Sequence, residues 1–284
     1  MLFLNNPRYR LLRRIVNKFK AFAAAFVYAR YRLMRLVRFR YLRLLVFFMW
    51  RLWLRKVHDI ERIPLDEPAI VVSNHSSYFD FFVLASVLRK HTVFVAVKNL
   101  NARTFVGWFM RLDIIVYVDR ERPGYAFFKE LLYHLKTQKR TVVIYPEGTR
   151  SRSGKMLAPK LGFVKLAMRA NVPIIPIAMK GTYEILPPHK KIPSFNKCDI
   201  YVGDKIYINP DNPEFQDVFE TQPAQKDGSY RLSDPQTQEI AFRIMEKVRR
   251  MAGVEWEDDV CWQKSVSSKD EAIIAPTKTP TDKC

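Results

Sequence analysis

The feature that most constrains the fold is a regular alternation, from residue 57 onward, of short apolar runs with segments of helical periodicity. The apolar runs lie at residues 69–72, 93–97, 114–118, 142–145 and 174–178. The helical segments lie at 78–88, 104–111, 125–136 and 162–170. Strands that read as continuous apolar runs are typical of sheets buried on both faces. We therefore predict an α/β fold in which a mixed, largely parallel sheet is covered by helices.

The last apolar run is marked by two prolines, Pro173 just before it and Pro176 within it. Proline has no backbone N–H and cannot donate to a neighbouring strand, so it is rare in central strands. We expect an edge, a bend or an irregular strand at this point of the sheet.

A histidine and an aspartate five positions apart, His75 and Asp80, follow the first apolar run. Five residues of α-helix turn through about 500°, so two such side chains on one helix point away from each other. The two can meet if His75 lies on the loop after a strand and Asp80 in the first helical turn, as the capping pattern from Ser77 to Asp80 indicates. The carboxylate would then orient the imidazole, whose other nitrogen could accept a hydroxyl proton. The alternative is that Asp80 merely caps the helix and His75 is a surface residue.

A second segment that carries functional groups, residues 147–150, lies just after the run 142–145. It would therefore lie at the carboxyl end of a strand, where open α/β sheets bind their ligands. Gly148 allows close approach of the backbone, Thr149 offers a hydroxyl, and Arg150 offers a planar fork suited to a phosphate. The alternative for Arg150 is an ordinary solvated surface charge.

Together these two segments resemble the glycerolipid acyltransferase family. The resemblance covers roughly residues 65 to 185, with four family blocks in order: the histidine block, residues 94–120, residues 145–150 and residues 172–177. It implies that His75 is the general base and Asp80 the carboxylate that orients it. It also implies that the acceptor's phosphate is bound by Glu147, Gly148, Thr149 and Arg150, with Lys98 and Arg120 at basic family positions nearby.

The implied activity is transfer of a fatty acyl group from an acyl thioester, acyl-CoA or acyl-carrier protein, to the free hydroxyl of 1-acylglycerol 3-phosphate, which forms phosphatidate. Glycerol 3-phosphate, another lysophospholipid or a lyso-ornithine lipid are alternative acceptors, because the catalytic motif is shared. From a different class, the chain could be a non-catalytic module that binds a membrane surface or a nucleic acid. We expect no cofactor, since the thioester is a substrate, and no metal, since no residue cluster has metal-ligand spacing.

The net charge of +20 is concentrated near the N-terminus, where fifteen Lys and Arg precede Asp59, the first acidic residue. These cations alternate with Leu, Phe, Trp, Tyr and Val, and apolar residues of the first segment recur at helical spacing, which favours a lipid surface over a nucleic acid. The charge-free stretches 21–29 and 44–50 are far shorter than the ~20 residues that span a bilayer. We predict an amphipathic helical hairpin that lies in one leaflet and sets its arginines against anionic headgroups. The alternative is a helix pair packed on the chain's own domain.

The predicted organisation has four parts. Residues 1–56 form the basic membrane-interface segment, 57–212 the acyltransferase α/β domain, 213–263 a C-terminal extension with one helix at 237–251, and 264–284 a disordered polar tail. The three cysteines, Cys198, Cys261 and Cys284, form no C-x-x-C pair and suggest reduced thiols. We therefore expect one-sided membrane association with the catalytic domain facing the cytoplasm.

Overall fold

The computed structural model describes residues 52–64, 66–88, 92–97, 114–118, 124–220 and 230–258. Several predictions lie outside these residues: the hairpin up to residue 51, the helix at 104–111, the polar tail 264–284, and the side chains of Lys98 and Arg120.

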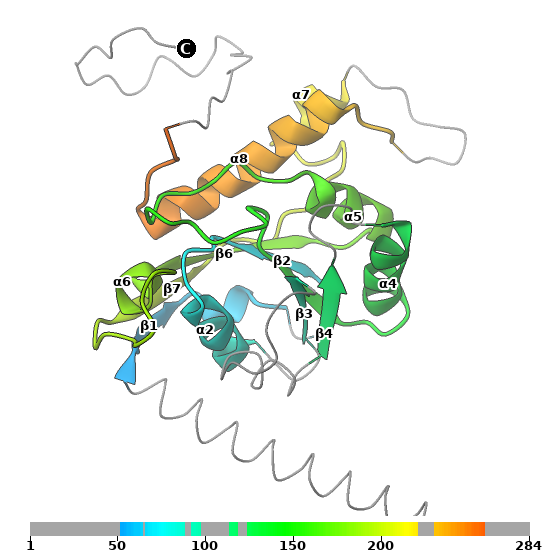
Figure 1. Cartoon of the computed structure of the whole chain (residues 1–284). Helices are drawn as coiled ribbons and strands as arrows, with labels where there is room; N and C mark the ends of the chain where they lie inside the picture. The colour runs from blue at the N-terminus through cyan, green and yellow to red at the C-terminus, as the bar shows by residue number, and fades with distance from the viewer. Residues whose placement is uncertain are drawn as a thin grey trace, which may run out of the picture.

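The described residues contain a seven-stranded sheet with the order β1-β7-β6-β2-β5-β3-β4 (Figure 1). The strands are β1 (Leu54–His58), β2 (Ile70–Ser73), β3 (Thr92–Val97), β4 (Ile114–Val118), β5 (Thr141–Ile144), β6 (Ile174–Lys180) and β7 (Cys198–Val202). Neighbouring strands run parallel except β6 and β7, which are antiparallel. The predicted mixed, largely parallel sheet is confirmed.

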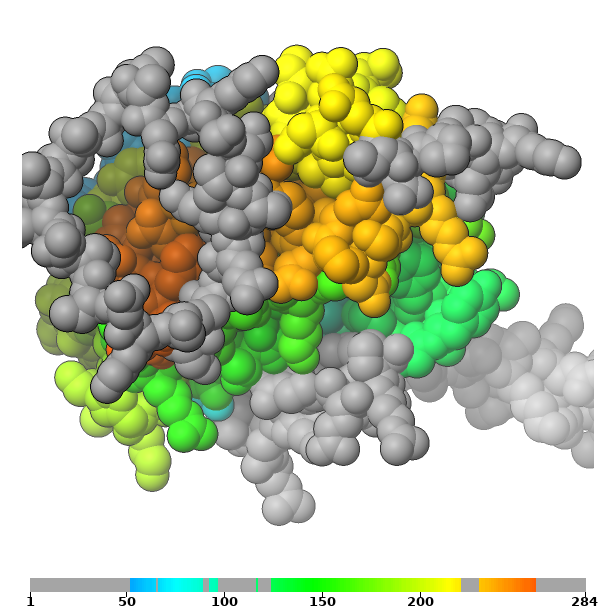
Figure 2. Space-filling view, turned by 90° about the horizontal axis from the view of Figure 1, so that it is seen from above, coloured from blue at the N-terminus to red at the C-terminus, as the bar shows by residue number. Residues whose placement is uncertain are grey.

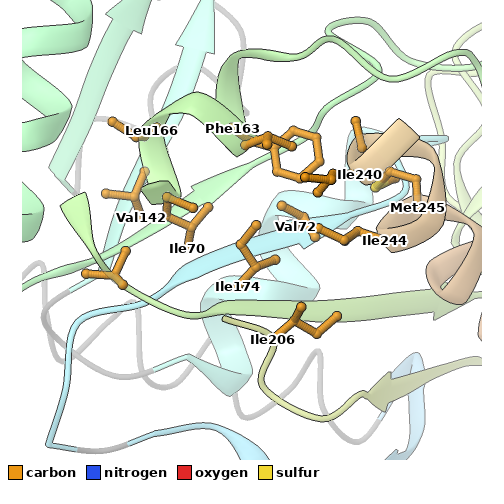
Figure 3. Packing of buried hydrophobic residues seen from close by; sticks show 14 of the residues in the cluster. Ile70, Val72, Val142, Phe163, Leu166, Ile174, Ile206, Ile240, Ile244 and Met245 are labelled. Atoms are coloured by element: carbon orange, nitrogen blue, oxygen red, sulfur yellow. The ribbon is translucent and has the colours of Figure 1, made fainter. Parts of the chain in front are cut away.

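Helices cover both faces of this sheet, so its central strands are buried (Figure 1). The helices are α2 (Phe79–Val87), α4 (Tyr125–Lys136), α5 (Gly162–Ala170), α6 (Thr182–Ile185), α7 (Gln216–Phe219) and α8 (Asp234–Ala252), with the short 3₁₀ turn η1 (Ile60–Arg62). Successive residues of a strand point to opposite faces. Ile70 and Val72 therefore pack with α4, α5 and α8, while Val71 packs with α2 on the other side. Figure 3 shows the first of these two cores.

The segment predicted as a C-terminal extension with one helix, from residue 213, contains α7 and α8, and α8 packs on the sheet. The helix begins at a capping box between Ser233 and Gln236 and ends at Gly253, whose φ of 66° suits glycine. It lies across one face of the molecule (orange in Figure 2). Its fully buried residues, Ile240 and Ile244 among them, share the core of β2 and β6. Residues 213 to 252 therefore complete the domain.

The predicted boundary between residues 56 and 57 falls inside β1. This strand forms one edge of the sheet and pairs in parallel with β7. Arg55 is ion-paired with Asp199, a β7 carboxylate that is almost fully buried. The sequence LRKVH of β1 carries three basic side chains and its burial does not alternate, so the strand could not be predicted.

Strand β6 lies inside the sheet, between β7 and β2, so of the three alternatives that we expected (an edge, a bend or an irregular strand) the edge position is excluded. The Pro176 carbonyl accepts from the Gly203 N–H at 2.8 Å, so this residue's backbone polar atoms face the β7 side. There the ladder is interrupted: Ile174 bridges Ile206, and regular pairing starts only at Ile177 and Val202. The missing N–H of proline therefore falls where β6 is not regularly paired with β7. The irregularity that we expected lies in this pairing. A Cβ on Gly203 would lie 2.8 Å from Pro176 Cγ, so glycine is needed there.

If α8 is part of the core, truncating one of its buried side chains should destabilise the whole domain. Ile244 has no exposed surface, so Ile244→Ala is expected to lower the free energy of unfolding by about 2–5 kcal/mol. Gln238→Ala, at an exposed position of the same helix, should change it by less than about 0.5 kcal/mol. Chemical denaturation of the full chain measures both, and equal stability of the two variants would show that α8 is only an appendage.

Candidate active site

The loop between β2 and α2 is fixed to the neighbouring strand by a buried asparagine. Asn74 donates through Nδ2 to the carbonyl of Met179 at 2.9 Å, and its Oδ1 accepts from the Met179 N–H at 2.8 Å. Met179 is in β6, so a side chain here continues the backbone pairing of β2 beyond the end of the strand. The next residue, His75, therefore leaves the sheet from a defined point.

His75 and Asp80 are brought together. His75 Nδ1 lies 2.9 Å from Asp80 Oδ2, with His75 on the loop and Asp80 in the first turn of α2. The same oxygen accepts from the backbone N–H groups of Ser76 at 2.8 Å and Ser77 at 2.9 Å. Asp80 is fully buried, and these three interactions offset the cost of burying Oδ2, whereas the buried Oδ1 has no hydrogen-bond partner among the described residues. The helix start differs from a simple capping box, because Ser77 Oγ accepts from the N–H of Phe79 at 2.9 Å.

The imidazole is held in an orientation that suits a general base. Because a carboxylate oxygen accepts at Nδ1, the ring proton belongs on that nitrogen, and Nε2 is left with a free lone pair. The ring of Tyr145 stacks on the imidazole with 4.1 Å between centroids. Burial raises the pKa of Tyr145 well above its ordinary value, and the charge of Asp80 raises it further. The stacked phenol is therefore neutral. The His75 side chain is 20% exposed, so a substrate hydroxyl can reach it.

The side chain of Glu147, which we expected to help bind the phosphate, is buried and bonded to two backbone N–H groups. Its Oε1 accepts from the backbone N–H of His75 at 2.7 Å, and its Oε2 accepts from that of Leu157 at 2.9 Å. The Ser151 N–H in turn donates to the His75 carbonyl at 2.9 Å. Burial raises the pKa of Glu147 to about 8, although the two hydrogen bonds from backbone N–H groups act in the opposite direction. Glu147 is therefore a positioning residue for the backbone of His75.

The turn that follows Glu147 brings Arg150 to the same place. Gly148 has a φ of 70°, and a Cβ there would lie 2.8 Å from Cε of Lys160, so the turn requires glycine. Thr149 is exposed. The guanidinium of Arg150 lies over the ring of Tyr78, with Cζ 3.4 Å from the centroid. Arg150 Nη1 is buried and has no hydrogen-bond partner among the described residues.

Three contributors to this site were not predicted: Asn74, Tyr78 and Tyr145. Asn74 precedes His75 and Tyr78 lies between His75 and Asp80, whereas Tyr145 is the last residue of an apolar run. Each acts through a partner that is distant in sequence, so no local spacing signals it. Lys98 and Arg120 lie outside the described residues. The strands before them, β3 and β4, run parallel to β5 and end at Val97 and Val118.

The described part of the chain contains no group of three or more His, Cys, Asp or Glu side chains arranged to hold a metal ion. None of its helices has the length and apolarity that crossing a membrane requires.

The raised pKa of Glu147 predicts a pH dependence of stability. Between its ordinary value of 4.5 and about 8, the folded protein keeps a proton that the unfolded chain releases, so the free energy of unfolding should fall as the pH rises through this window. The glutamine of Glu147→Gln does not titrate, so this variant should lose less stability than the wild type from pH 5 to pH 8. Glu255→Gln, at an exposed position, should retain the wild-type slope. Denaturation curves at several pH values test this, and identical slopes for all three proteins would contradict it.

The comparisons with known proteins agree with this geometry. Residues 54–180 match the family model described as Acyltransferase. The protein described as 1-acyl-sn-glycerol-3-phosphate acyltransferase alpha from sheep, Ovis aries, is 33% identical over 149 residues, which is 52% of each chain. The 1-acyl-sn-glycerol-3-phosphate acyltransferase of Saccharomyces cerevisiae is 33% identical over 126 residues, 43% of this chain and 42% of that protein. The chain thus spans about half the length, or less, of these curated relatives.

The fold is also that of a solved structure. The crystal structure of the 1-acyl-sn-glycerophosphate (LPA) acyltransferase PlsC from Thermotoga maritima has a TM-score of 0.52 and 24% sequence identity, and covers 72% of this chain and 74% of that one. At this identity the likeness concerns the fold alone. The family match, in contrast, runs from β1 to β6 and includes both loops of the site. The part of the chain that holds the sheet from β1 to β6 and the two loops with His75, Asp80 and Arg150 is therefore similar to the acyltransferase family.

Proposed function

We propose that the protein transfers a fatty acyl group from an acyl thioester to the free hydroxyl of 1-acylglycerol 3-phosphate and so forms phosphatidate. The observation that carries the proposal is the contact of His75 Nδ1 with the buried Asp80 at 2.9 Å, which leaves Nε2 free beside the loop that supplies Arg150. The names of the sheep and yeast relatives support this choice of acceptor.

The chemistry needs one base and one leaving group. His75 Nε2 removes the proton of the acceptor hydroxyl as that oxygen attacks the thioester carbonyl. The tetrahedral intermediate then collapses: the new ester forms, the C–S bond breaks, and the imidazolium returns the proton to the departing thiolate. Because a thiolate leaves readily, no covalent acyl-enzyme is needed. Asp80 orients the ring and stabilises its protonated form during the step.

The acceptor is positioned through its phosphate. Arg150 carries a guanidinium whose buried Nη1 has no partner within the described residues, so a phosphate oxygen could accept from it. The ring of Tyr78 packs against one face of the guanidinium and leaves the N–H groups in its plane available. Lys98 and Arg120 complete the proposed phosphate contacts. Holding the phosphate fixes the hydroxyl near His75, which converts an encounter of two molecules into a reaction within one complex.

The donor is acyl-CoA or acyl-carrier protein, and the reaction as proposed uses no cofactor. We also propose that residues 1–56 attach the enzyme to one side of a membrane, with its catalytic domain in the cytoplasm. The basic residues of this segment and the absence of acidic ones before Asp59 support attachment to anionic lipids.

Removing the base should remove the activity. His75→Ala is expected to lower kcat by about 10²–10⁴-fold or more, because the hydroxyl loses its proton acceptor. Asp80→Asn should lose nearly as much, since an amide cannot enforce the required ring tautomer. Thioester release measured with lysophosphatidate tests both. His58→Ala, which changes a histidine on edge strand β1, is the control and should match the wild type. Activity of His75→Ala within threefold of wild type would overturn the mechanism.

Removing the phosphate anchor should affect one substrate more than the other. Arg150→Ala is expected to raise the KM for the phosphorylated acceptor by about tenfold or more while the KM for the acyl donor changes little. Arg150→Lys should restore only part of the affinity, because an ammonium lacks the planar fork. Tyr78→Leu should raise the acceptor KM too, whereas Tyr78→Phe keeps the ring and should not. Steady-state kinetics with each substrate varied in turn separates these effects, and a change confined to the donor KM would show that Arg150 serves the other site.

A further inference from the structure

The loop between α6 and β7, residues 186–197, exposes two large apolar side chains. Ile192 is 79% and Phe195 81% exposed, the highest values among the large aliphatic and phenylalanine side chains of the described residues. Leu52, 41% exposed, lies beside the same loop, because its carbonyl accepts from Lys197 Nζ at 2.6 Å. We call Leu52, Ile192 and Phe195 the apolar patch. Clustered exposure of this kind marks an interaction site more often than chance.

The loop is fixed in place, so the patch is not a product of a loose segment. The Ser194 N–H donates to the carbonyl of Ile185 at 2.8 Å, and Ser194 Oγ donates to that of Glu184 at 2.6 Å. The Ser194 carbonyl in turn accepts from Trp53 Nε1 at 2.6 Å. The Phe195 ring stacks parallel to that of Trp53, with 6.3 Å between centroids. Two elements far apart in sequence therefore present these side chains outward together.

The charges on the loop itself have one sign. Lys190, Lys191 and Lys197 are exposed, and no acidic residue occurs between Ile185 and Lys197, although the exposed Glu184 lies just before the loop. Apolar side chains flanked by lysines suit the boundary between headgroups and acyl chains, where the apolar groups insert and the ammonium groups meet phosphates. A nucleic acid would match the charge but would leave Ile192 and Phe195 in water.

The position of the patch also fits a lipid surface. Residues 1–51, with their many arginines and apolar side chains, join the described domain at Leu52. On the inner side, Trp53 meets the ring of Phe79 edge-on at 5.3 Å, and Ser77 Oγ donates to the Leu186 carbonyl at 2.6 Å. Figure 1 shows α6 and β1 at one end of the sheet beside α2, with α4 at the other end. The contacts of Trp53 and Leu186 therefore place the patch next to the start of α2, the helix that follows the His75 loop.

We infer that the loop 186–197 is a membrane-docking loop that inserts Ile192 and Phe195 into a lipid surface and sets Lys190 and Lys191 against anionic headgroups. This contact belongs to the α/β domain itself and is distinct from the attachment proposed for residues 1–56. It does not rest on the proposed acceptor, because lipid binding can be measured without turnover.

The first test measures partition of the full chain onto vesicles of phosphatidylcholine with anionic phosphatidylglycerol. The double variant Ile192→Ser/Phe195→Ser is expected to bind about tenfold or more weakly, because two large apolar groups no longer insert. Lys190→Glu/Lys191→Glu should weaken binding and reduce its salt dependence. Tyr125→Ser removes a side chain that is 82% exposed on α4, at the opposite end of the sheet, and should bind like the wild type. Wild-type binding by both loop variants, together with no change in the emission of the labelled loop described next, would overturn the inference.

The second test reports on the loop directly, so that strong attachment through residues 1–56 cannot mask it. Ile192→Cys is labelled with an environment-sensitive fluorophore in a chain that also carries Cys261→Ser and Cys284→Ser; Cys198 is buried. The emission should shift to the blue on addition of anionic vesicles. Emission that is already blue-shifted and unchanged by vesicles would show that the chain's own N-terminal segment covers the patch. A shift that follows protein concentration in the absence of lipid would assign the patch to a second copy. Either result overturns the inference.

Discussion

The site depends on how the backbone of His75 is held between two strand ends. Its N–H donates to Glu147 and its carbonyl accepts from Ser151, so the loop after β2 is bonded on both sides to the loop after β5. The carboxyl group of Glu147 is taken out of water for this purpose, and its pKa rises to about 8 as a result. A buried carboxyl group is costly unless its oxygens are bonded, and both are bonded here to backbone N–H groups. The burial of Glu147 thus goes together with a fixed backbone position for His75.

The parts of the structure that could be predicted from the sequence depend on contacts between residues close together in the chain. The alternation of apolar runs and helical segments fixes strand and helix positions, because burial on two faces of a sheet imposes it. The pairing of His75 with Asp80 is also local: five residues across a strand-to-helix loop suffice to bring the atoms to 2.9 Å. Helices α4 and α5 begin and end at the predicted residues, since each shows apolar spacing over its whole length.

What could not be predicted depends on partners distant in the chain. β1 carries charged side chains and joins the sheet by pairing with β7, whose residues lie more than a hundred positions later in the chain. The inner position of β6 depends on the interrupted pairing opposite Pro176, where Gly203 has no side chain to collide with the proline ring. The role of Glu147 is hidden in the same way, because a carboxylate beside a phosphate-binding motif looks like part of that motif until its two N–H donors are known. Tyr78 likewise becomes meaningful only when Arg150 lies over it.

The strand order sets the geometry available for catalysis. β2 and β5 are neighbours and run parallel, with Val72 opposite Ile144, so the two loops that follow them leave the same edge of the sheet. The two loops are also bonded to each other through the backbone of His75, which contacts Glu147 and Ser151. In the proposed mechanism, the parallel pairing of these two central strands is what brings the base on one loop and the phosphate anchor on the other to the same edge of the sheet. The buried bonds of Asn74 and Asp80 then hold the His75 loop in place.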